Sequence, residues 1–399
     1  MRPTLSATAG ACLSALDRLE RLLDGIRPPG RAPAIAEPAA HEIEHVLVWT
    51  MDRLGDVQRA TPAIRILKKR YPAAHLAVVV TARSAPILEC NPWVDAVYPV
   101  ANPYDPSAHF QTLRRLPTGT WDLGVLLEVD PHWAKLGQWA FALLGVRRWG
   151  AFDFGWRRPP GAHMIPLDER GSWIDQFVRL AVSLGAQRDD AGLDLCLRDP
   201  ERRWAEEFLS SRGVPAQAPF FLLHPGGNFL TVSRRWPPES YARLAELIRR
   251  AWAHPIVVTG AAAERGIVEA IRRRTPVPLV DLAGQLTLRQ LMAVIERSAL
   301  CIMNDTGPLH FAQALRRPTV AILGPTAPEV VGIPATTRAV RLDLPCSPCA
   351  FLTGWQACRN PRQWECVTAL SPDQVFEAVV RQMARATGSA LAPGVAGSG

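Results

Sequence analysis

The strongest constraint on the fold is an alternation between short apolar runs and longer helical segments, which occurs twice in the 399-residue chain. The first series contains HVLVW, HLAVVV, DAVYPV and DLGVLLEV, between residues 45 and 129. The second contains FFLLH, PIVVTG, PLVDL, ALCIM and TVAIL, between residues 220 and 323. Continuous apolar runs of this length are typical of strands covered on both faces. Strands that alternate with helices predict βαβ units and parallel sheets.

Two such series predict an α/β protein with two doubly wound, Rossmann-like domains that face one another across a ligand-binding cleft. We expect an N-terminal helix and Pro/Ala linker over residues 1–40, a first domain over 41–199 and a second over 200–370. The segment PERRWAEEFLSSRG (200–213) predicts a connecting helix at the start of the second domain. A C-terminal helix over 371–387 and a disordered tail over 388–399 complete the prediction.

The formal charge of +8 favours an anionic partner. No dense Lys/Arg run is interleaved with aromatic residues, which argues against nucleic acid. No apolar run approaches the ~20 residues that a membrane span needs. Charged residues from Asp17 to Arg21 interrupt the N-terminal segment, so a signal peptide is not predicted and a cytoplasmic protein is expected. The leucines between positions 13 and 23 predict an amphipathic helix that packs on protein or, alternatively, on a membrane surface.

Asp56 follows the first predicted strand in the segment WTMDRLGDVQRATPAIR (49–65). We place it in the loop before a helix that runs from about Val57 to Arg70, at the carboxyl end of the strand. An aspartate here either caps the helix or faces a ligand. No G-x-G-x-x-G accompanies it, which argues against a nicotinamide-dependent enzyme.

Two glycine-containing turns mark the second domain. In LLHPGGNFLTVSRRWPP, Gly226 and Gly227 follow a strand and allow close approach of the backbone to a ligand, while Arg234 could hold phosphate oxygens through two donors. The alternative is an ordinary turn with solvated arginines. In VVTGAAAERG, Glu264 lies in the first turn of a helix, where it either complements the helix dipole or accepts a ribose hydroxyl.

The stretch MNDTGPLHFAQAL (303–315) joins a buried strand directly to a helix. A helix N-terminus offers unpaired amides and partial positive charge, which suit a phosphate. Asp305 is negative and would repel a phosphate placed against it. It therefore either caps the turn or faces a neutral polar part of the same ligand, such as sugar hydroxyls.

In order and spacing, RLGDVQRATPAIR, LLHPGGN with SRRWP, VTGAAAE, NDTGPLHFAQAL and AILGPTAP resemble glycosyltransferase family 9, the heptosyltransferases of lipopolysaccharide core. The resemblance extends from about His45 to Val379. It implies a GT-B fold, with an acceptor-binding domain over 41–199 and an ADP-heptose-binding domain over 200–370. It further implies inverting transfer from ADP-L-glycero-D-manno-heptose to an anionic inner-core acceptor, with no metal or other cofactor required for the chemistry.

By this resemblance, Asp56 is the catalytic base that takes the proton of the acceptor hydroxyl. Arg53 and Arg59 are expected to contact the acceptor. The donor-binding residues implied are Gly226, Gly227, Arg234, Glu264, Asp305, Thr306, Gly307, Leu309 and His310. Arg234 stands where the family usually has lysine. The compact ammonium charge of lysine is thereby replaced by a planar guanidinium with several N–H donors. His310 either faces the nucleotide or is a packed core histidine.

Four cysteines, Cys346, Cys349, Cys358 and Cys366, are clustered near the C-terminus. Four thiolates within such a span could form a structural zinc or iron site; the alternative is four reduced thiols that brace a loop. Cys12, Cys90, Cys196 and Cys301 are scattered in apolar surroundings and are predicted to be small core residues.

Two other functions stay open at this point. One is a family 9 transferase with a different acceptor, such as a protein hydroxyl or another glycan, and the other is a nucleotide-sugar-binding protein without transferase activity. We expect acceptor specificity to lie in loops such as Asn102–His109 and His132–Lys135, where no pattern is recognised. A lipopolysaccharide acceptor would bring the protein to the cytoplasmic face of the inner membrane as a peripheral protein.

Overall fold

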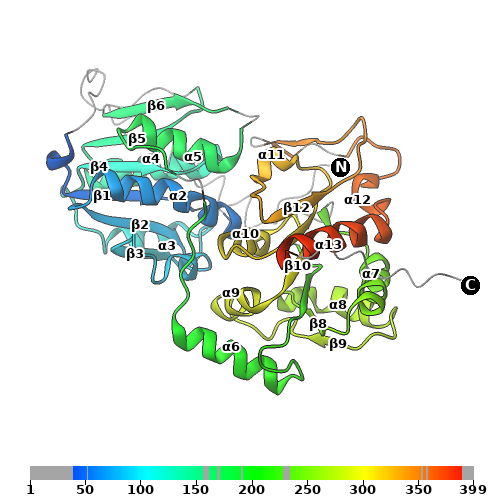
Figure 1. Ribbon diagram of the computed structural model, residues 1–399. Coiled ribbons are helices and arrows are strands. Elements are labelled where there is room, and N and C mark those ends of the chain that lie inside the picture. Colours follow the sequence, from blue (N-terminus) through cyan, green and yellow to red (C-terminus); the bar gives the residue numbers. More distant parts are fainter. Residues whose placement is uncertain are drawn as a thin grey trace, which may run out of the picture. The chain divides into compact units, whose positions relative to one another are not determined.

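The structure is a computed structural model that describes residues 39–51, 53–155, 161–168, 171–189, 192–227, 234–351, 354–355 and 358–388. The predicted N-terminal helix and the predicted tail lie almost entirely outside these residues. The chain divides into two compact units, each with its own sheet (Figure 1). Unit 1 comprises the residues up to Asp168 together with Ile174–Ala191, and unit 2 comprises Glu169–Trp173 and Gly192–Gly399. The sequence prediction places this change between residues 199 and 200.

Unit 1 is built on a six-stranded parallel sheet with the order β3-β2-β1-β4-β5-β6. Its strands are β1 (His45–Trp49), β2 (His75–Thr81), β3 (Ala96–Val100), β4 (Leu123–Leu126), β5 (Arg148–Asp153) and β6 (Ala162–Pro166). Its helical segments are η1 (Ala40–Glu42), α2 (Leu54–Arg70), η2 (Ala85–Leu88), α3 (Pro106–Leu113), α4 (Pro131–Leu144) and α5 (Trp173–Ser183).

The core of unit 1 forms where helices cover the central strands. β1 and β2 are buried along almost their whole length, as their continuous apolar sequences predict. Trp49, Val79 and Phe141 belong to one hydrophobic cluster. Gly124 of β4 allows α4 to approach the sheet closely, because a Cβ at this position would lie 2.5 Å from the Phe141 ring.

Unit 2 repeats the same topology, with a parallel sheet of order β12-β11-β10-β7-β8-β9. The strands are β7 (Phe221–His224), β8 (Ile256–Val258), β9 (Leu279–Asp281), β10 (Leu300–Asn304), β11 (Thr319–Ile322) and β12 (Thr337–Val340). The helices are α6 (Asp199–Ser211), α7 (Pro238–Ala251), η4 (Ala262–Glu264), α8 (Arg265–Arg272), α9 (Leu288–Arg297), α10 (Gly307–Ala314), α11 (Pro328–Val331), α12 (Glu365–Thr368) and α13 (Pro372–Thr387). A short hairpin, β13 (Ala350–Phe351) with β14 (Gly354–Trp355), precedes α12.

Both sheets have the strand order of doubly wound Rossmann-like folds, so the predicted α/β fold class is confirmed. Every predicted strand is present, and the predicted connecting helix is α6. Five strands were not predicted: β5, β6 and β12 of the two large sheets, and the short hairpin strands β13 and β14. β6 and β12 are half-exposed edge strands without a continuous apolar run, and β5, although buried, has a charged residue at each end of its sequence RWGAFD.

Two further findings concern the whole chain. Within the part of the chain that the structure describes, none of the helices combines the length and apolar character that crossing a membrane requires. Cys90 and Cys196 are each disulfide-bonded, whereas the sequence predicted both to be small core residues. Cys301 is a buried free thiol, as predicted, and burial raises its pKa to about 12.

Candidate active site

The predicted site residues gather at one topological position in each unit. In a doubly wound sheet the strand order reverses between the first and fourth strands, and ligands bind outside the carboxyl ends at that point. The reversal lies between β1 and β4 in unit 1 and between β7 and β10 in unit 2. Asp56 follows β1, whereas Gly226 follows β7 and Asp305 follows β10.

Asp56 lies inside the first turn of α2 rather than in the preceding loop, because the helix begins at Leu54. Its carboxylate accepts a hydrogen bond from the Arg53 amide at 3.2 Å, which satisfies a backbone group that the helix itself cannot. The same carboxylate forms an ion pair with Arg59 in the next turn, and Arg59 also donates to the Gly55 carbonyl at 3.2 Å. Asp56 is only 4% exposed. Its position and orientation are therefore held from two sides.

The two arginines predicted to contact the acceptor differ in their placement. Arg59 is paired with Asp56, so in this structure its guanidinium positions a carboxylate. Arg53 is exposed and caps α2 through its backbone. An acceptor contact by either residue stays a prediction.

The loop after β1 is tied to the loop after β4 by Glu128, which sequence analysis did not single out. The Met51 amide donates to the Glu128 carboxylate, and Glu128 is 1% exposed. Two residues later, Asp130 caps α4 by accepting from the His132 amide at 2.8 Å. Glu128 and Asp130 lie at the end of a predicted strand, and this position in the sequence could have marked them as candidate site residues. The carboxyl edge of unit 1 thus contains Asp56 and Glu128, which follow the neighbouring strands β1 and β4.

In unit 2, Asn304 at the end of β10 connects three segments. Its amide nitrogen donates to the Pro225 carbonyl at 2.8 Å and to the Gly226 carbonyl at 3.2 Å. Its side-chain oxygen accepts from the Tyr241 hydroxyl at 2.9 Å and from the Trp236 amide at 3.3 Å. Asn304 is fully buried. It was not among the predicted site residues, although it is the first polar residue of the quoted NDTGP motif.

Glu264 holds the glycine turn from the other side. Its carboxylate accepts from the Gly227 amide at 2.5 Å and from the Ala261 amide at 2.7 Å. A Cβ on Gly226 would lie 2.2 Å from the Glu264 carboxylate, so only glycine fits there without displacement. Beneath the turn, burial lowers the pKa of His224, and the negative charge of Glu264 acts in the opposite direction. In this structure Glu264 fixes the loop, and its expected ribose contact stays a prediction.

Two arginines join this network through different groups. The guanidinium of Arg234 lies 2.8 Å from the carboxylate of Asp305, and both side chains are largely buried. Arg235 donates to the Gly227 carbonyl, one contact being 3.0 Å. The structure therefore brings Arg234, Asp305 and the glycine turn together, and their contact with a donor stays a prediction. Arg235, named in the motif but not predicted as a site residue, supports the turn.

The N-terminus of α10 follows Asp305 at once. Thr306 caps the helix and Gly307 is its first residue, so neither amide has an acceptor inside the helix. The Leu309 amide, by contrast, donates to the Thr306 carbonyl at 3.0 Å. Of the predicted donor-binding residues at this helix, Thr306 and Gly307 therefore have backbone amides that form no hydrogen bond within the helix.

His310 is 2% exposed, and its Nδ1 lies 2.9 Å from Gln313 Oε1. This arrangement matches the packed-histidine alternative. A contact with the nucleotide stays a prediction.

The four C-terminal cysteines lie close enough to influence one another. Burial raises the pKa of Cys366 to about 11, and the other three thiols contribute in the same direction. Burial also raises the pKa of Cys349. Cys346 is exposed and lies 3.5 Å from the Asn360 amide nitrogen. Within the described ranges, no three His, Cys, Asp or Glu side chains are arranged to hold a metal ion.

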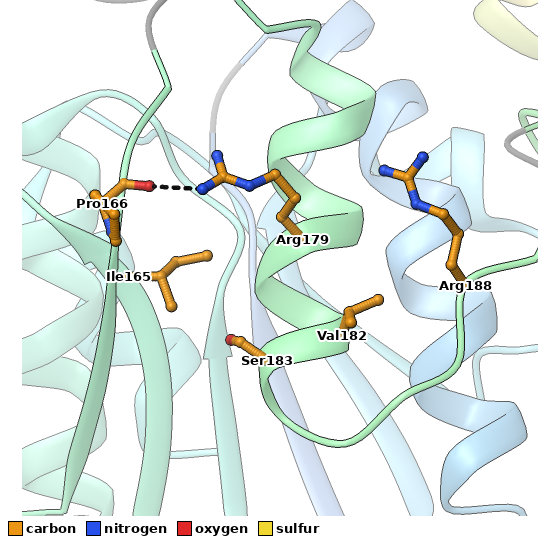
Figure 2. A pocket seen from close by; sticks show the side chains of 6 residues that line it. All are labelled: Ile165, Pro166, Arg179, Val182, Ser183 and Arg188. Carbon is orange, nitrogen blue, oxygen red and sulfur yellow. Dashed lines mark hydrogen bonds between the residues drawn. The ribbon is translucent and has the colours of Figure 1, made fainter.

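A cavity of about 420 Å³ in unit 1 lies away from the predicted site (Figure 2). Its lining comprises Ile165, Pro166, Arg179, Val182, Ser183 and Arg188. Figure 2 shows Arg179 directed at the Pro166 carbonyl, to which it donates at 3.4 Å. Arg188 is paired with Asp175 at 2.7 Å. The cationic groups around this cavity thus have partners within unit 1, and none of the predicted site residues lines it.

Two Rossmann-like units in one chain, each with its own doubly wound parallel sheet, are the architecture of the GT-B fold. Residues 174–353 match the sequence profile of glycosyltransferase family 9 (heptosyltransferase). The chain is 26% identical over 299 residues to lipopolysaccharide heptosyltransferase 2 of Salmonella typhimurium, an alignment that covers 71% of this chain and 84% of that protein.

Solved structures agree with this assignment at the level of the fold. The family 9 glycosyl transferase from Veillonella parvula superposes with a TM-score of 0.74 at 21% identity, covering 89% of this chain and all of the other. The ADP-heptose lipopolysaccharide heptosyltransferase II of E. coli gives a TM-score of 0.67 at 18% identity, covering 86% and 99% of the two chains. The family 9 match over residues 174–353, together with the similarity to a heptosyltransferase over most of the chain, confirms the resemblance predicted from the motifs.

Proposed function

We propose that this protein transfers heptose from ADP-L-glycero-D-manno-heptose to an anionic inner-core acceptor of lipopolysaccharide, with inversion at the anomeric carbon. The observation that carries the proposal is the arrangement at the unit 2 switch point. There the glycine turn, the Arg234–Asp305 pair and the first amides of α10 are adjacent. This combination suits a nucleotide diphosphate sugar, which is anionic at one end and neutral and polar at the other.

The diphosphate leaves as the bond to the anomeric carbon breaks, so negative charge grows on its oxygens. Donors that already point at that charge lower the barrier, because they need no reorganisation during the reaction. We assign this role to the Thr306 and Gly307 amides and to the guanidinium of Arg234. A guanidinium has five N–H donors in a planar fork, so Arg234 can bind Asp305 and phosphate oxygens together.

The two buried acids of unit 2 suit hydroxyl groups rather than phosphates. A carboxylate has about four acceptor positions. Glu264 uses two of them on backbone amides, so further positions can accept a ribose hydroxyl. Asp305 is neutralised by Arg234, which lets it lie near a diphosphate while it accepts hydroxyls of the heptose.

Asp56 is the proposed base. As the acceptor oxygen forms its bond to the anomeric carbon, its proton passes to the Asp56 carboxylate, and ADP departs with the bonding electron pair. Arg59 and the Arg53 amide hold this carboxylate in one orientation. This fixed orientation favours the reaction, because a base displaced from the acceptor hydroxyl accelerates proton transfer much less.

The direct test uses purified protein, ADP-heptose and a lipopolysaccharide inner-core acceptor. We expect release of ADP that depends on the acceptor, and a product whose new linkage has the opposite anomeric configuration by NMR. Donor binding by calorimetry without ADP release, across lipopolysaccharide, glycan and protein acceptors, would instead indicate a nucleotide-sugar-binding protein. Release with a protein or another glycan alone would keep the transferase and replace the acceptor.

The donor is tested separately by thermal unfolding with ADP-, UDP- and GDP-linked sugars. A ligand present at about 100 times its Kd stabilises the native state by ~2.7 kcal/mol. We expect ADP-heptose to raise Tm more than UDP-sugars at equal concentration. Stabilisation by UDP-sugars alone would contradict the donor assignment.

We propose, as a separate point, that the four C-terminal thiols hold a structural zinc or iron ion outside the reaction. Their mutual proximity supports this, although their arrangement in the described residues is not that of a formed metal site. Elemental analysis of the purified protein should find about one metal ion per chain, lost when Cys349 and Cys366 are both replaced by serine. A metal-free wild-type protein with four alkylatable thiols would indicate a thiol-braced loop.

The proposed acceptor is anchored in lipid, so we place the reaction at the cytoplasmic face of the inner membrane. The net charge of +8 suits peripheral attraction to an anionic surface. The bonded state of Cys90 and Cys196 is a counter-indication, since disulfides persist mainly in oxidising compartments. Counting free thiols in protein isolated under alkylating conditions tests this point.

A further inference from the structure

Two aromatic side chains meet at the carboxyl edge of unit 1, in the loops that were expected to determine acceptor specificity. Tyr104 lies in the loop after β3, and Trp133 lies in the first turn of α4, after β4. Their ring centroids are 5.7 Å apart with an interplanar angle of 56°. Tyr104 is 56% exposed and Trp133 is half-buried. The edge thus presents a paired aromatic surface to solvent.

The loop that carries Tyr104 is held in place by a local turn and by a buried histidine ring. The Tyr104 amide donates to the Asn102 side chain at 3.0 Å. Nε2 of His109 lies 2.8 Å from the Pro103 carbonyl, and the buried His109 ring stacks on Trp49 with centroids 6.2 Å apart. Trp49 is the last residue of β1, so the exposed tyrosine is connected to the sheet through two rings. These contacts hold the backbone on both sides of the tyrosine side chain.

Trp133 is fixed from the other loop. Asp130 caps α4 and Pro131 begins it, which places Trp133 on the first turn of a regular helix. Both rings therefore stand on ordered backbone, on the same edge of the sheet as Asp56. Large, rigid and exposed aromatic side chains are typical anchors of recognition surfaces, since they lose little conformational entropy on binding.

We propose that the Tyr104–Trp133 pair is a stacking platform for a neutral sugar ring of the acceptor. The face of an aromatic ring carries partial negative charge, which attracts the weakly positive C–H groups on the face of a pyranose. Asn102 and Asp105 lie in the same loop as Tyr104 and supply polar side chains that can bond sugar hydroxyls. This inference rests on the proposed function, because it assigns a residue-level subsite to the acceptor of that reaction.

A saccharide fits this surface better than a lipid membrane does. Asp105 and Asp130 flank the two rings and would be repelled by anionic lipid headgroups. Phe110 of α3, which is 61% exposed, is the more apolar exposed ring of the same unit, and the guanidinium of Arg114 covers it at 6.0 Å. Phe110 therefore provides a matched control, because it is exposed and aromatic but does not belong to the pair.

The test compares Tyr104→Ala, Tyr104→Phe and Phe110→Ala with the wild-type protein. The probe is core oligosaccharide freed of lipid, and its binding is followed without donor by saturation-transfer NMR and by tryptophan fluorescence. Loss of one stacking ring is expected to weaken oligosaccharide binding, and to raise the acceptor KM, about tenfold for Tyr104→Ala. Tyr104→Phe retains the ring and should lose less than about twofold. Phe110→Ala should bind the oligosaccharide like the wild type, and the KM for ADP-heptose should not change in any variant.

Three results would overturn the platform. The first is wild-type oligosaccharide affinity in a folded Tyr104→Ala protein, and the second is an equal loss in Phe110→Ala. The third is unchanged oligosaccharide binding while both alanine variants lose affinity for phosphatidylglycerol vesicles, which would assign the rings to a membrane. Trp133→Leu supplies a second, independent variant if Tyr104→Ala does not fold. Failure of the proposed function is recognised separately, because the wild type would then bind oligosaccharide without releasing ADP.

Discussion

The two switch points, where the strand order of each sheet reverses, have the same topology. They differ in how many of their polar groups form hydrogen bonds or ion pairs with one another. In unit 2, Asn304, Glu264 and Arg235 fasten the glycine turn, and Arg234 neutralises Asp305. In unit 1, Asp56 is fastened by Arg59 and a backbone amide and Glu128 is bonded to the Met51 amide, but Tyr104 on the same edge of the sheet is 56% exposed. The polar groups of the unit 2 edge are bonded to one another, whereas the unit 1 edge combines fixed carboxylates with an exposed surface.

The difference follows from what each edge is proposed to bind. A leaving diphosphate needs donors and charges whose positions do not change during the reaction, and such positions require supporting hydrogen bonds. An acceptor is recognised by shape and by polar contacts over a larger surface, which loops on a rigid sheet provide. Substitutions at the two edges should therefore affect different kinetic quantities.

The largest effect is expected at the base. Asp56→Asn keeps the size of the side chain but removes its ability to accept a proton, so kcat should fall by at least ~10²-fold. ADP affinity, a property of unit 2, should stay close to that of the wild type. Acceptor-dependent ADP release and calorimetry with ADP measure the two quantities. An unchanged kcat would remove Asp56 from the role of base.

The next effect concerns stability in unit 2. Asn304→Ala removes four hydrogen bonds and leaves buried groups of Tyr241 and Pro225 without this partner, so unfolding should cost about 1–3 kcal/mol less. Chemical denaturation measures the loss, and ADP affinity should fall with it because the glycine turn is released. Asn91→Ala in unit 1 is a comparison, since that loop asparagine caps only its own turn at Trp93. Equal ADP affinities in Asn304→Ala and the wild type would contradict the connecting role of Asn304.

A smaller effect isolates the glycine turn itself. Gly226→Ala forces a Cβ into the Glu264 carboxylate and should weaken ADP binding about tenfold, with kcat at saturating donor less affected. Gly266→Ala in α8 is the matched control, because a Cβ there meets no atom within 4 Å. The control should gain up to ~1 kcal/mol of stability, since alanine favours a helix. Equal ADP affinities in the two variants would show that the close approach of Gly226 to Glu264 does not contribute to ADP binding.

The smallest effects are expected at one ion pair of each unit. Arg65 lowers the pKa of Asp189 in unit 1, and Arg289 lowers the pKa of Glu201 in unit 2. A depressed carboxyl pKa contributes stability above the pKa of the unfolded chain, and that stability is lost as pH falls through the folded-state pKa. Asp189→Asn and Glu201→Gln should each cost less than ~1 kcal/mol at pH 7, because both acids are partly exposed. Denaturation at pH 7 and pH 3 should show the difference from wild type shrinking in acid, and a difference that grows in acid would contradict the assignment.

Much of the site could be predicted because residues at strand ends meet at one edge of a parallel sheet. Asp56, Gly226 and Asp305 were located this way, whereas the ion pair of Arg234 with Asp305 joins two separate motifs. The start of α2 was predicted too late, because the aspartate that ends the loop in the sequence instead completes the first helical turn. Arg59 was expected to contact the acceptor, yet the structure pairs it with Asp56, since residues three apart in a helix lie on one face.

The alternation of apolar and helical segments by itself determined the class of fold, since the period of a strand or helix is a local property of the chain. The family motifs likewise carried the assignment of the chemistry. The tertiary structure alone decided that Asn304 joins β10 to two distant loops, that Glu128 supports the loop after β1, and that Tyr104 meets Trp133. These contacts connect residues far apart along the chain. They depend on strand order and helix placement, which no local pattern encodes.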